Sequence, residues 1–195
     1  MTTSTASARP SGSRAAQTAA RRARLIETAI ELAADGGYDA VQMRDVAAHA
    51  GVALGTLYRH FSSKDELLVA ALAQQISTLR YRVEQRSTAG DTPAERVADV
   101  LRRACRALER RPDLTAAMFT AMSSAGDMPV KLDVHDGFSA IIAGALDGQE
   151  VGDLDAIVGV LGHVWFAALM FRVGGMAPAG RMAEDLVRAT QLLLR

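Results

Sequence analysis

Cross-linking chemistry is nearly absent from this 195-residue chain. Its one cysteine, Cys105, has no second cysteine to pair with, which excludes an internal disulfide and predicts a reducing, cytoplasmic location. No histidine or aspartate lies close to Cys105 in sequence, so we interpret it as a buried helix residue and not as an activated thiol. The alternating, β-branched runs that are typical of strands are also missing. These absences predict an all-α fold.

Signals for export, membranes, metals and cofactors are missing as well. Residues 1–13 are rich in Ser, Thr and Ala without an apolar run, which predicts a disordered tail and not a secretory signal. The longest uncharged apolar stretch, 156–171, is shorter than the ~20 residues that span a bilayer. The sequence has no metal-spaced Cys/His cluster and no phosphate-binding glycine loop. We therefore expect no membrane, metal or cofactor partner.

Charge is balanced overall but unevenly distributed. The net charge is zero, yet residues 1–64 hold eight Lys/Arg against five Asp/Glu, and residues 65–195 hold 14 against 17. A basic N-terminal part on an acidic remainder fits a protein whose N-terminal part alone meets phosphates. An enzyme would need a catalytic constellation, and the best candidate, His135-Asp136, has no nucleophile or carboxylate spaced to match. No catalytic residues are expected.

Apolar residues recur at spacings of three and four, which predicts about nine helices. Gly36-Gly37 is expected to end the first of them, and capping boxes at Ser63–Glu66 and Thr92–Glu95 to start two others. The expected ranges are 14–35, 43–50, 54–60, 63–86, 92–110, 112–124, 129–146, 153–173 and 179–194.

Two short helices separated by Ala50-Gly51-Val52 indicate a helix-turn-helix in a domain spanning 14–62. Gly51 supplies the left-handed backbone of a tight turn. The expected core of this module is Val46, Val52, Leu57 and Phe61. The outer side of its second helix then carries Thr56, Tyr58, Arg59 and His60, which suits a helix in a major groove about 12 Å wide.

The runs 37–47 (GYDAVQMRDVA) and 50–68 (AGVALGTLYRHFSSKDELL) closely resemble the DNA-binding module of the TetR family. The resemblance implies a regulator that binds palindromic operator DNA as a homodimer. Gln42 and Ala53 depart from the Ser or Thr that is frequent in the family, so two helix caps are expected to be missing. The residues expected to contact bases or phosphates are Gln42, Arg44, Ala53, Leu54, Gly55, Thr56, Tyr58, His60 and Lys64.

Residues 63–195 are expected to form a helical ligand-binding and dimerisation domain. The stretch 156–171 is apolar almost all round and is predicted to be buried on nearly every side, partly by a second subunit. The resemblance implies that the last two helices form the four-helix bundle of the dimer. The small or apolar residues assigned to this seam are Gly159, Gly162, Ala167, Ala168, Ala183, Leu186, Val187, Thr190, Leu193 and Leu194.

A ligand pocket is expected among large side chains of this domain, although each of them has the alternative of being plain core. Charged residues are sparse there, which favours an apolar or amphipathic ligand, and methionine suits adaptable cavities. The runs 111–118 (RPDLTAAM) and 164–165 (VW) resemble the TetR-type repressors of cholesterol catabolism, whose inducers are steroid coenzyme A thioesters. The expected ligand contacts are Met118, Phe119, Met122, Phe138, Trp165 and Leu169.

The prediction is therefore a ligand-responsive repressor that an inducer, a steroid or fatty acyl-CoA thioester, releases from its operator. A DNA-binding activator or architectural protein without a ligand is the alternative. A sizeable apolar cavity in the second domain favours the first hypothesis.

Overall fold

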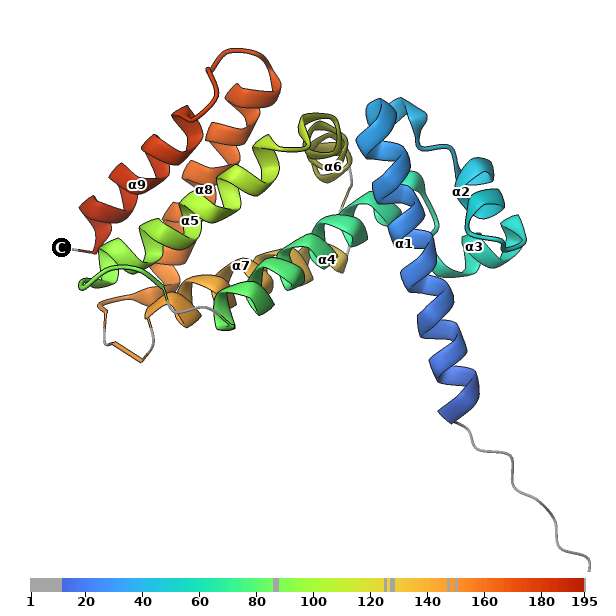
Figure 1. Ribbon diagram of the computed structural model, residues 1–195, viewed down its shortest axis with the longest axis horizontal. Coiled ribbons are helices and arrows are strands. Elements are labelled where there is room, and N and C mark those ends of the chain that lie inside the picture. Colours follow the sequence, from blue (N-terminus) through green and yellow to red (C-terminus); the bar gives the residue numbers. More distant parts are fainter. Residues whose placement is uncertain are drawn as a thin grey trace, which may run out of the picture.

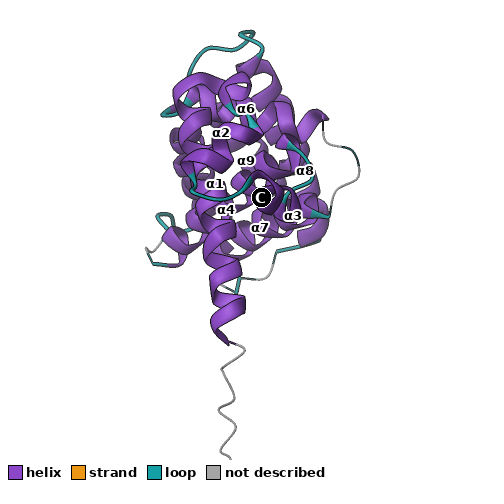
Figure 2. Ribbon diagram, turned by 90° about the vertical axis from the view of Figure 1, so that its right-hand side faces the viewer, coloured by secondary structure: helices purple, strands orange, loops and turns teal. Residues whose placement is uncertain are grey.

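The computed structural model describes residues 12–85, 88–124, 126, 129–146, 148–149 and 151–194. Within these ranges the chain forms nine helices and no strand, as predicted (Figures 1 and 2). The helices are α1 (Gly12–Ala40), α2 (Met43–His49), α3 (Leu54–His60), α4 (Lys64–Glu84), α5 (Pro93–Glu109), α6 (Pro112–Ser124), α7 (Val130–Leu146), α8 (Leu154–Val173) and α9 (Arg181–Leu193). We call α1–α3 the head and α4–α9 the body.

The first helix is broken where the sequence predicts its end. Gly36 and Gly37 have non-helical backbone angles, and the φ of Gly37 is 69°, in the left-handed region that glycine tolerates without strain. A short helical piece then continues to Ala40. The predicted tail, residues 1–13, lies outside the described residues apart from its last two positions.

Buried apolar side chains form two clusters. The head core joins α1, α2 and α3 to the first half of α4 and to α6, through residues such as Leu25, Leu57 and Leu68. The body core joins α5, α7, α8 and α9, through residues such as Leu101 and Leu161. The head core therefore continues past residue 62, where the sequence analysis places the end of the first domain.

Two long helices belong to both cores. On α4, Leu67 and Leu68 are buried in the head core, whereas Ile76 and Leu79 pack against the body core. α7 lies alongside α4 (Figure 1) and approaches it closely at Gly137, where an added Cβ would come within 2.6 Å of Ile76 Cγ2. α6 packs mainly against α1 and α4 and touches α5 and α8 less extensively. The head core is therefore connected to the body core through α4, α6 and α7.

Candidate nucleic-acid interface and body sites

The turn between α2 and α3 depends on Gly51. Its φ of 66° is left-handed, a conformation that side chains other than glycine rarely adopt. Val46, Leu57 and Phe61 are buried beneath the turn in the head core, and Val52 is half-buried against the same cluster. The expected helix-turn-helix and its core are therefore confirmed.

The two helices of this module begin without side-chain caps. Gln42 precedes α2 and Ala53 precedes α3, and neither side chain accepts a hydrogen bond from the first turn. The Gln42 amide instead donates to the carbonyl oxygen of Asp39, 2.8 Å away. Two caps, each of which usually contributes ~1 kcal/mol, are missing as expected.

The outer side of α3 is polar and accessible. Tyr58 exposes 51% of its surface, Arg59 is exposed, and Thr56 and His60 are half-buried. Arg59 Nη2 donates to Thr56 Oγ1 across 2.9 Å, so these two side chains orient each other. Gly55 is exposed, and an added Cβ there would meet nothing within 4 Å. A short helix with hydrogen-bond donors on one side, and with a glycine instead of a larger side chain near its N-terminus, can approach base edges in a major groove.

Lys64, at the start of α4, is held by Tyr38. Its Nζ donates to the Tyr38 carbonyl oxygen at 3.1 Å and lies 3.6 Å from the centroid of the ring, a cation–π contact. The Tyr38 hydroxyl donates to Asp65 Oδ1 at 2.6 Å, and this hydrogen bond, with burial as the next cause, raises the pKa of Tyr38 to about 12. An ammonium has three N–H donors, so Lys64 keeps donors for a phosphate while its position is fixed.

The predicted capping box at the start of α4 is half right. Ser63 Oγ accepts from the Glu66 backbone N–H at 3.1 Å. The Glu66 carboxylate, however, accepts from the backbone N–H and the hydroxyl of Ser62, both at 2.7 Å, and not from Ser63. The second predicted box, at Thr92 and Glu95, is complete. The Ser62–Glu66 pair ties the chain between α3 and α4 to the first turn of α4.

The remaining predicted DNA contacts lie in the same region. Arg44 on α2 and Ala53 before α3 are exposed, and Leu54 is half-buried against the head core. All nine predicted residues fall between Gln42, which precedes α2, and Lys64, the first residue of α4, at the end of the molecule opposite α9 (Figure 1). Their contact with DNA remains a prediction.

In the body, α8 leaves much apolar surface uncovered. It is the one helix in the described part of the chain that is long and apolar enough to cross a membrane, with a mean hydropathy of 1.8, yet only 22% of its apolar window is buried. Ile157 and Leu161 face the body core. A single protomer therefore leaves α8 largely uncovered, and its expected burial by a second subunit stays a prediction. Four large apolar side chains on the outer side are 44–47% exposed: Val160, Phe166, Met170 and Phe171.

Several residues that were assigned to a dimer seam face inward instead. An added Cβ at Gly162 would lie 3.9 Å from Phe138, so this glycine faces α7. Leu186 and Thr190 on α9 are 0% exposed, and the Thr190 hydroxyl donates to the Leu186 carbonyl oxygen at 2.8 Å. The apolar stripe of α9 therefore packs on the body core of its own protomer. On the outer side of α9, Leu192 exposes 57% of its surface.

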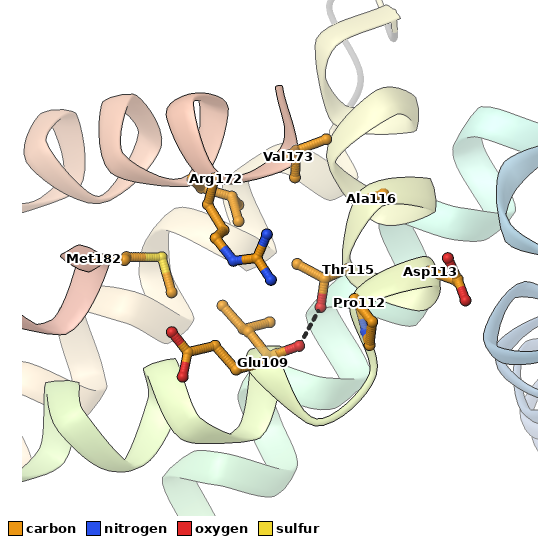
Figure 3. A pocket seen from close by; sticks show the side chains of 10 residues that line it. Glu109, Pro112, Asp113, Thr115, Ala116, Arg172, Val173 and Met182 are labelled. Carbon is orange, nitrogen blue, oxygen red and sulfur yellow. Dashed lines mark hydrogen bonds between the residues drawn. The ribbon is translucent and has the colours of Figure 1, made fainter. Parts of the chain in front are cut away.

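A small pocket of about 190 Å³ lies between the ends of α5 and α8 and the starts of α6 and α9. Figure 3 shows the Arg172 guanidinium pointing into it near Glu109 and Thr115, whereas Asp113 points away. Arg172 Nε is buried without a hydrogen-bond partner. Glu109 Oε1 accepts from the Gly180 backbone N–H at 2.7 Å, and Thr115 Oγ1 donates to the Leu108 carbonyl at 2.9 Å. This site was not among the sites predicted from the sequence. Its one signal was Arg172 itself, an isolated cation in an apolar helix.

The six predicted ligand contacts are divided between the two cores. Met118 is buried in the head core and Met122 packs against it. Phe138 and Trp165 pack against the body core, with ring centroids 5.6 Å apart in an edge-to-face pair. Among the six, Leu169 is the one that lines the pocket of Arg172.

The sixth predicted contact, Phe119 on α6, lies 5.2 Å between ring centroids from Phe166 on α8. It joins the two groups across the space between α6 and α8. The predicted residues therefore lie along the boundary between the head core and the body core, which we call the core seam to distinguish it from the predicted dimer seam. Their contact with a ligand remains a prediction.

Comparison with known proteins agrees with this architecture. The family of "Bacterial regulatory proteins, tetR family" matches residues 25–71, and the "Tetracyclin repressor-like, C-terminal domain" matches residues 90–193. The chain is 36% identical over 182 residues to the "HTH-type transcriptional repressor KstR" of Mycolicibacterium smegmatis, which covers 89% of this chain and 87% of that protein. The protein of the same name from Mycobacterium tuberculosis is 35% identical over 180 residues and covers 89% and 80%.

Solved structures extend the likeness to the whole body. A TetR transcriptional regulator from Rhodococcus sp. RHA1 has a TM-score of 0.84 at 35% identity, covering 91% of this chain and 97% of that one. Thermus thermophilus FadR, solved in complex with lauroyl-CoA, shares the fold with a TM-score of 0.72 at 22% identity, over 89% and 93% of the two chains. The helix-turn-helix head, the all-helical body and these matches over most of the chain identify it as a member of the TetR family of bacterial transcriptional regulators.

Proposed function

We propose that this chain is a ligand-responsive transcriptional repressor that binds a palindromic operator as a dimer and is released by an acyl or steroid coenzyme A thioester. The observation that carries the DNA-binding part is the geometry of α3. Its outer side is accessible and polar at Tyr58 and Arg59, its start is bare at Gly55, and Lys64 is held next to it. Its likeness to named transcriptional repressors over most of the chain supports the direction of regulation.

The outer side of α8 supports dimerisation. Exposed Val160, Met170 and Phe171 lie on one side of a helix whose other side is packed, and Phe166 lies at the edge of this side, where it also contacts Phe119 of α6. Contiguous exposed apolar surface of this kind marks an interface. A lipid-facing helix is the less suitable explanation, because α8 is packed into the body on its other side and its end carries Arg172. A second copy of α8 covers the stripe and sets the distance between two heads, which must be roughly 34–36 Å to reach successive major grooves.

Ligand sensing in this proposal depends on the boundary between the two cores and not on a sizeable preformed cavity. The pocket of about 190 Å³ is smaller than the roughly 300–1,000 Å³ of typical ligand sites. A steroid or long acyl chain must therefore enlarge the space, and the weakly connected boundary is between α6 and α8. Because α6 packs mainly on α1 and α4, its displacement moves the head relative to the body. A ligand that binds better to the displaced geometry lowers operator affinity.

The arrangement also suggests where a thioester's acyl group lies. Phe119, Phe138, Trp165 and Met118 supply an apolar lining along the core seam. Arg172, with its partnerless Nε, is the one cation of the neighbouring pocket, whose apolar lining includes Leu108 and Leu169. We therefore place the acyl or steroid moiety along the core seam, with polar groups of the ligand directed toward Arg172.

The test is an operator gel shift titrated with steroid and fatty acyl-CoA thioesters, using a duplex selected from a random library by the protein itself. We expect one thioester class to weaken binding about 5–150-fold, the range of a typical allosteric coupling. Trp165 is the one tryptophan in the chain, so its emission reports occupation of the core seam directly. A Phe138→Leu variant, which alters the ring that packs on Trp165, should shift the ligand concentration needed for release.

Three results would contradict parts of the proposal. Unchanged operator binding and unchanged Trp165 emission with every thioester would support the alternative of a ligand-free DNA-binding protein. Release without any change in Trp165 emission would place the ligand away from the core seam. Failure to select any palindrome would remove the repressor function itself.

A further inference from the structure

The first three turns of α1 project beyond the head. Every residue from Arg14 to Arg24 is exposed, and packing begins at Leu25, which is 0% exposed. Figures 1 and 2 show this part of α1 extending past the rest of the molecule. At 1.5 Å per residue the projecting part is about 16 Å long. We call residues 14–24 the arm.

The arm is purely cationic. It contains Arg14, Arg21, Arg22 and Arg24 and no acidic residue. None of the four forms an ion pair with a carboxylate of the described residues. Arg21 and Arg24 are three positions apart on the helix, a spacing at which like charges repel each other, and a bound anion would relieve this repulsion. Its alanines are strong helix formers, which keeps the arm extended as a continuation of the anchored helix.

The arm leaves the head beside α3, the second helix of the helix-turn-helix. The guanidinium carbon of Arg22 lies 5.1 Å from the ring centroid of Phe61, the residue that directly follows α3. From Arg22 toward the N-terminus, Ala19, Thr18 and Ala15 continue the same side of α1 and line a shallow concave surface with Arg14. Small side chains between two arginines allow a close approach of whatever binds there. The surface is therefore continuous with the DNA-facing end of the head.

We propose that the arm is a second DNA contact, which lies against the phosphates that flank the groove occupied by α3. A length of about 16 Å exceeds the ~12 Å width of a major groove, so a rod that starts at the end of α3 reaches the neighbouring backbone. Phosphate contacts add affinity and fix orientation without reading sequence. The proposal rests on the DNA-binding function proposed above and adds to it a site outside the helix-turn-helix.

The test compares two variants of the full chain that remove the same charge. The arm variant changes Arg14, Arg21, Arg22 and Arg24 to Gln, a residue with similar helix propensity. The control changes four exposed arginines of the body, Arg106, Arg110, Arg111 and Arg188, to Gln. Affinity is measured over a range of salt concentrations on a 30-base-pair duplex of mixed sequence and on the selected operator. The mixed duplex keeps the test independent of whether a specific operator exists.

We expect the arm variant to bind both duplexes at least tenfold more weakly, and the control to bind like the wild type. The slope of log K against log salt should fall by about 0.9 for each phosphate contact that is lost. The difference should vanish on an operator trimmed to the two α3 half-sites, because the flanking phosphates are then absent. Circular dichroism and thermal melting check that both variants are folded.

Three results would overturn the proposal. If the arm variant and the control lose DNA affinity equally, the loss would be explained by net charge alone. If the salt slope is unchanged but a more slowly migrating complex with several protein copies is lost from the gel, the arm would instead make contacts between protein copies. Unchanged DNA binding together with arm-dependent binding to vesicles containing phosphatidylglycerol would assign it to a membrane surface. If the wild type binds the mixed duplex arm-dependently but selects no palindrome, the arm stands and the repressor function fails.

Discussion

Replacing Met170 with Glu is expected to abolish the dimer while leaving each protomer folded. Met170 lies on the outer side of α8 and exposes 44% of its surface in the protomer. Fully burying a methionine side chain contributes about 1.5–3 kcal/mol. Covering the exposed part on two symmetric subunits therefore contributes about 2 kcal/mol to association. Burying two carboxylates without partners adds a cost of several kcal/mol.

The combined loss is about 4–6 kcal/mol, which corresponds to a dissociation constant at least ~1,000-fold higher. Sedimentation velocity over a range of protein concentrations measures it, and a gel shift on the selected palindrome should show the loss of two-headed binding. Leu132→Glu is the matched control, because Leu132 is a large apolar residue on α7 with 65% exposure. If Met170→Glu stays dimeric at the concentrations where the wild type and Leu132→Glu do, the interface lies on another surface.

Three further substitutions test other parts of the structure. Tyr58→Phe should weaken binding to every duplex by a similar factor without changing base preference, since a hydroxyl on a phosphate carries no sequence information; a change in the selected sequence would place Tyr58 against a base. Leu186→Glu should destabilise the protomer by about 3–5 kcal/mol in urea unfolding, because it buries a carboxylate in a fully enclosed apolar site; a folded monomer of normal stability would contradict the inward placement of Leu186. Ser63→Ala should cost about 1 kcal/mol of unfolding free energy through loss of the α4 cap, and Ser77→Ala, an exposed position on the same helix, should change it little.

The sequence was sufficient to predict the helices and the DNA-binding module. Local features decide those elements: Gly51 for the turn, Gly36-Gly37 for the break in α1, and Thr92 for the start of α5. The missing caps at Gln42 and Ala53 could also be predicted, because neither residue is one of the short polar residues (Ser, Thr, Asp, Asn) that cap a first turn.

Partners of the apolar faces could not be predicted in the same way. Periodicity shows that α8 and α9 have apolar sides, but not which neighbour covers each side. Leu186 and Gly162 therefore looked like dimer-seam residues, although α9 packs on the body core and Gly162 faces Phe138. The pocket of Arg172 joins residues from four helices, and only the folded arrangement brings them together. The incomplete capping box of α4 has a local cause, because the Glu66 carboxylate accepts from Ser62 and not from the predicted cap residue, Ser63.

The division into two cores gives a physical reason why binding in the body can reach the DNA-binding head. α6 belongs to the head core through Met118 but meets α8 through Phe119 and Phe166. α4 and α7 run through both cores and touch at Gly137, where the fit against Ile76 leaves no room for a methyl group. Separating the two helices would leave a void at this closely packed point, so we expect strain introduced between α6 and α8 to be relieved by a rotation of the head core and not by loosening of α4 from α7. Because α3 and Lys64 are fixed to that same core through Leu57 and Tyr38, they move with it as one body. In the proposed dimer, such a rotation would change the spacing of the two heads without disturbing contacts within either head.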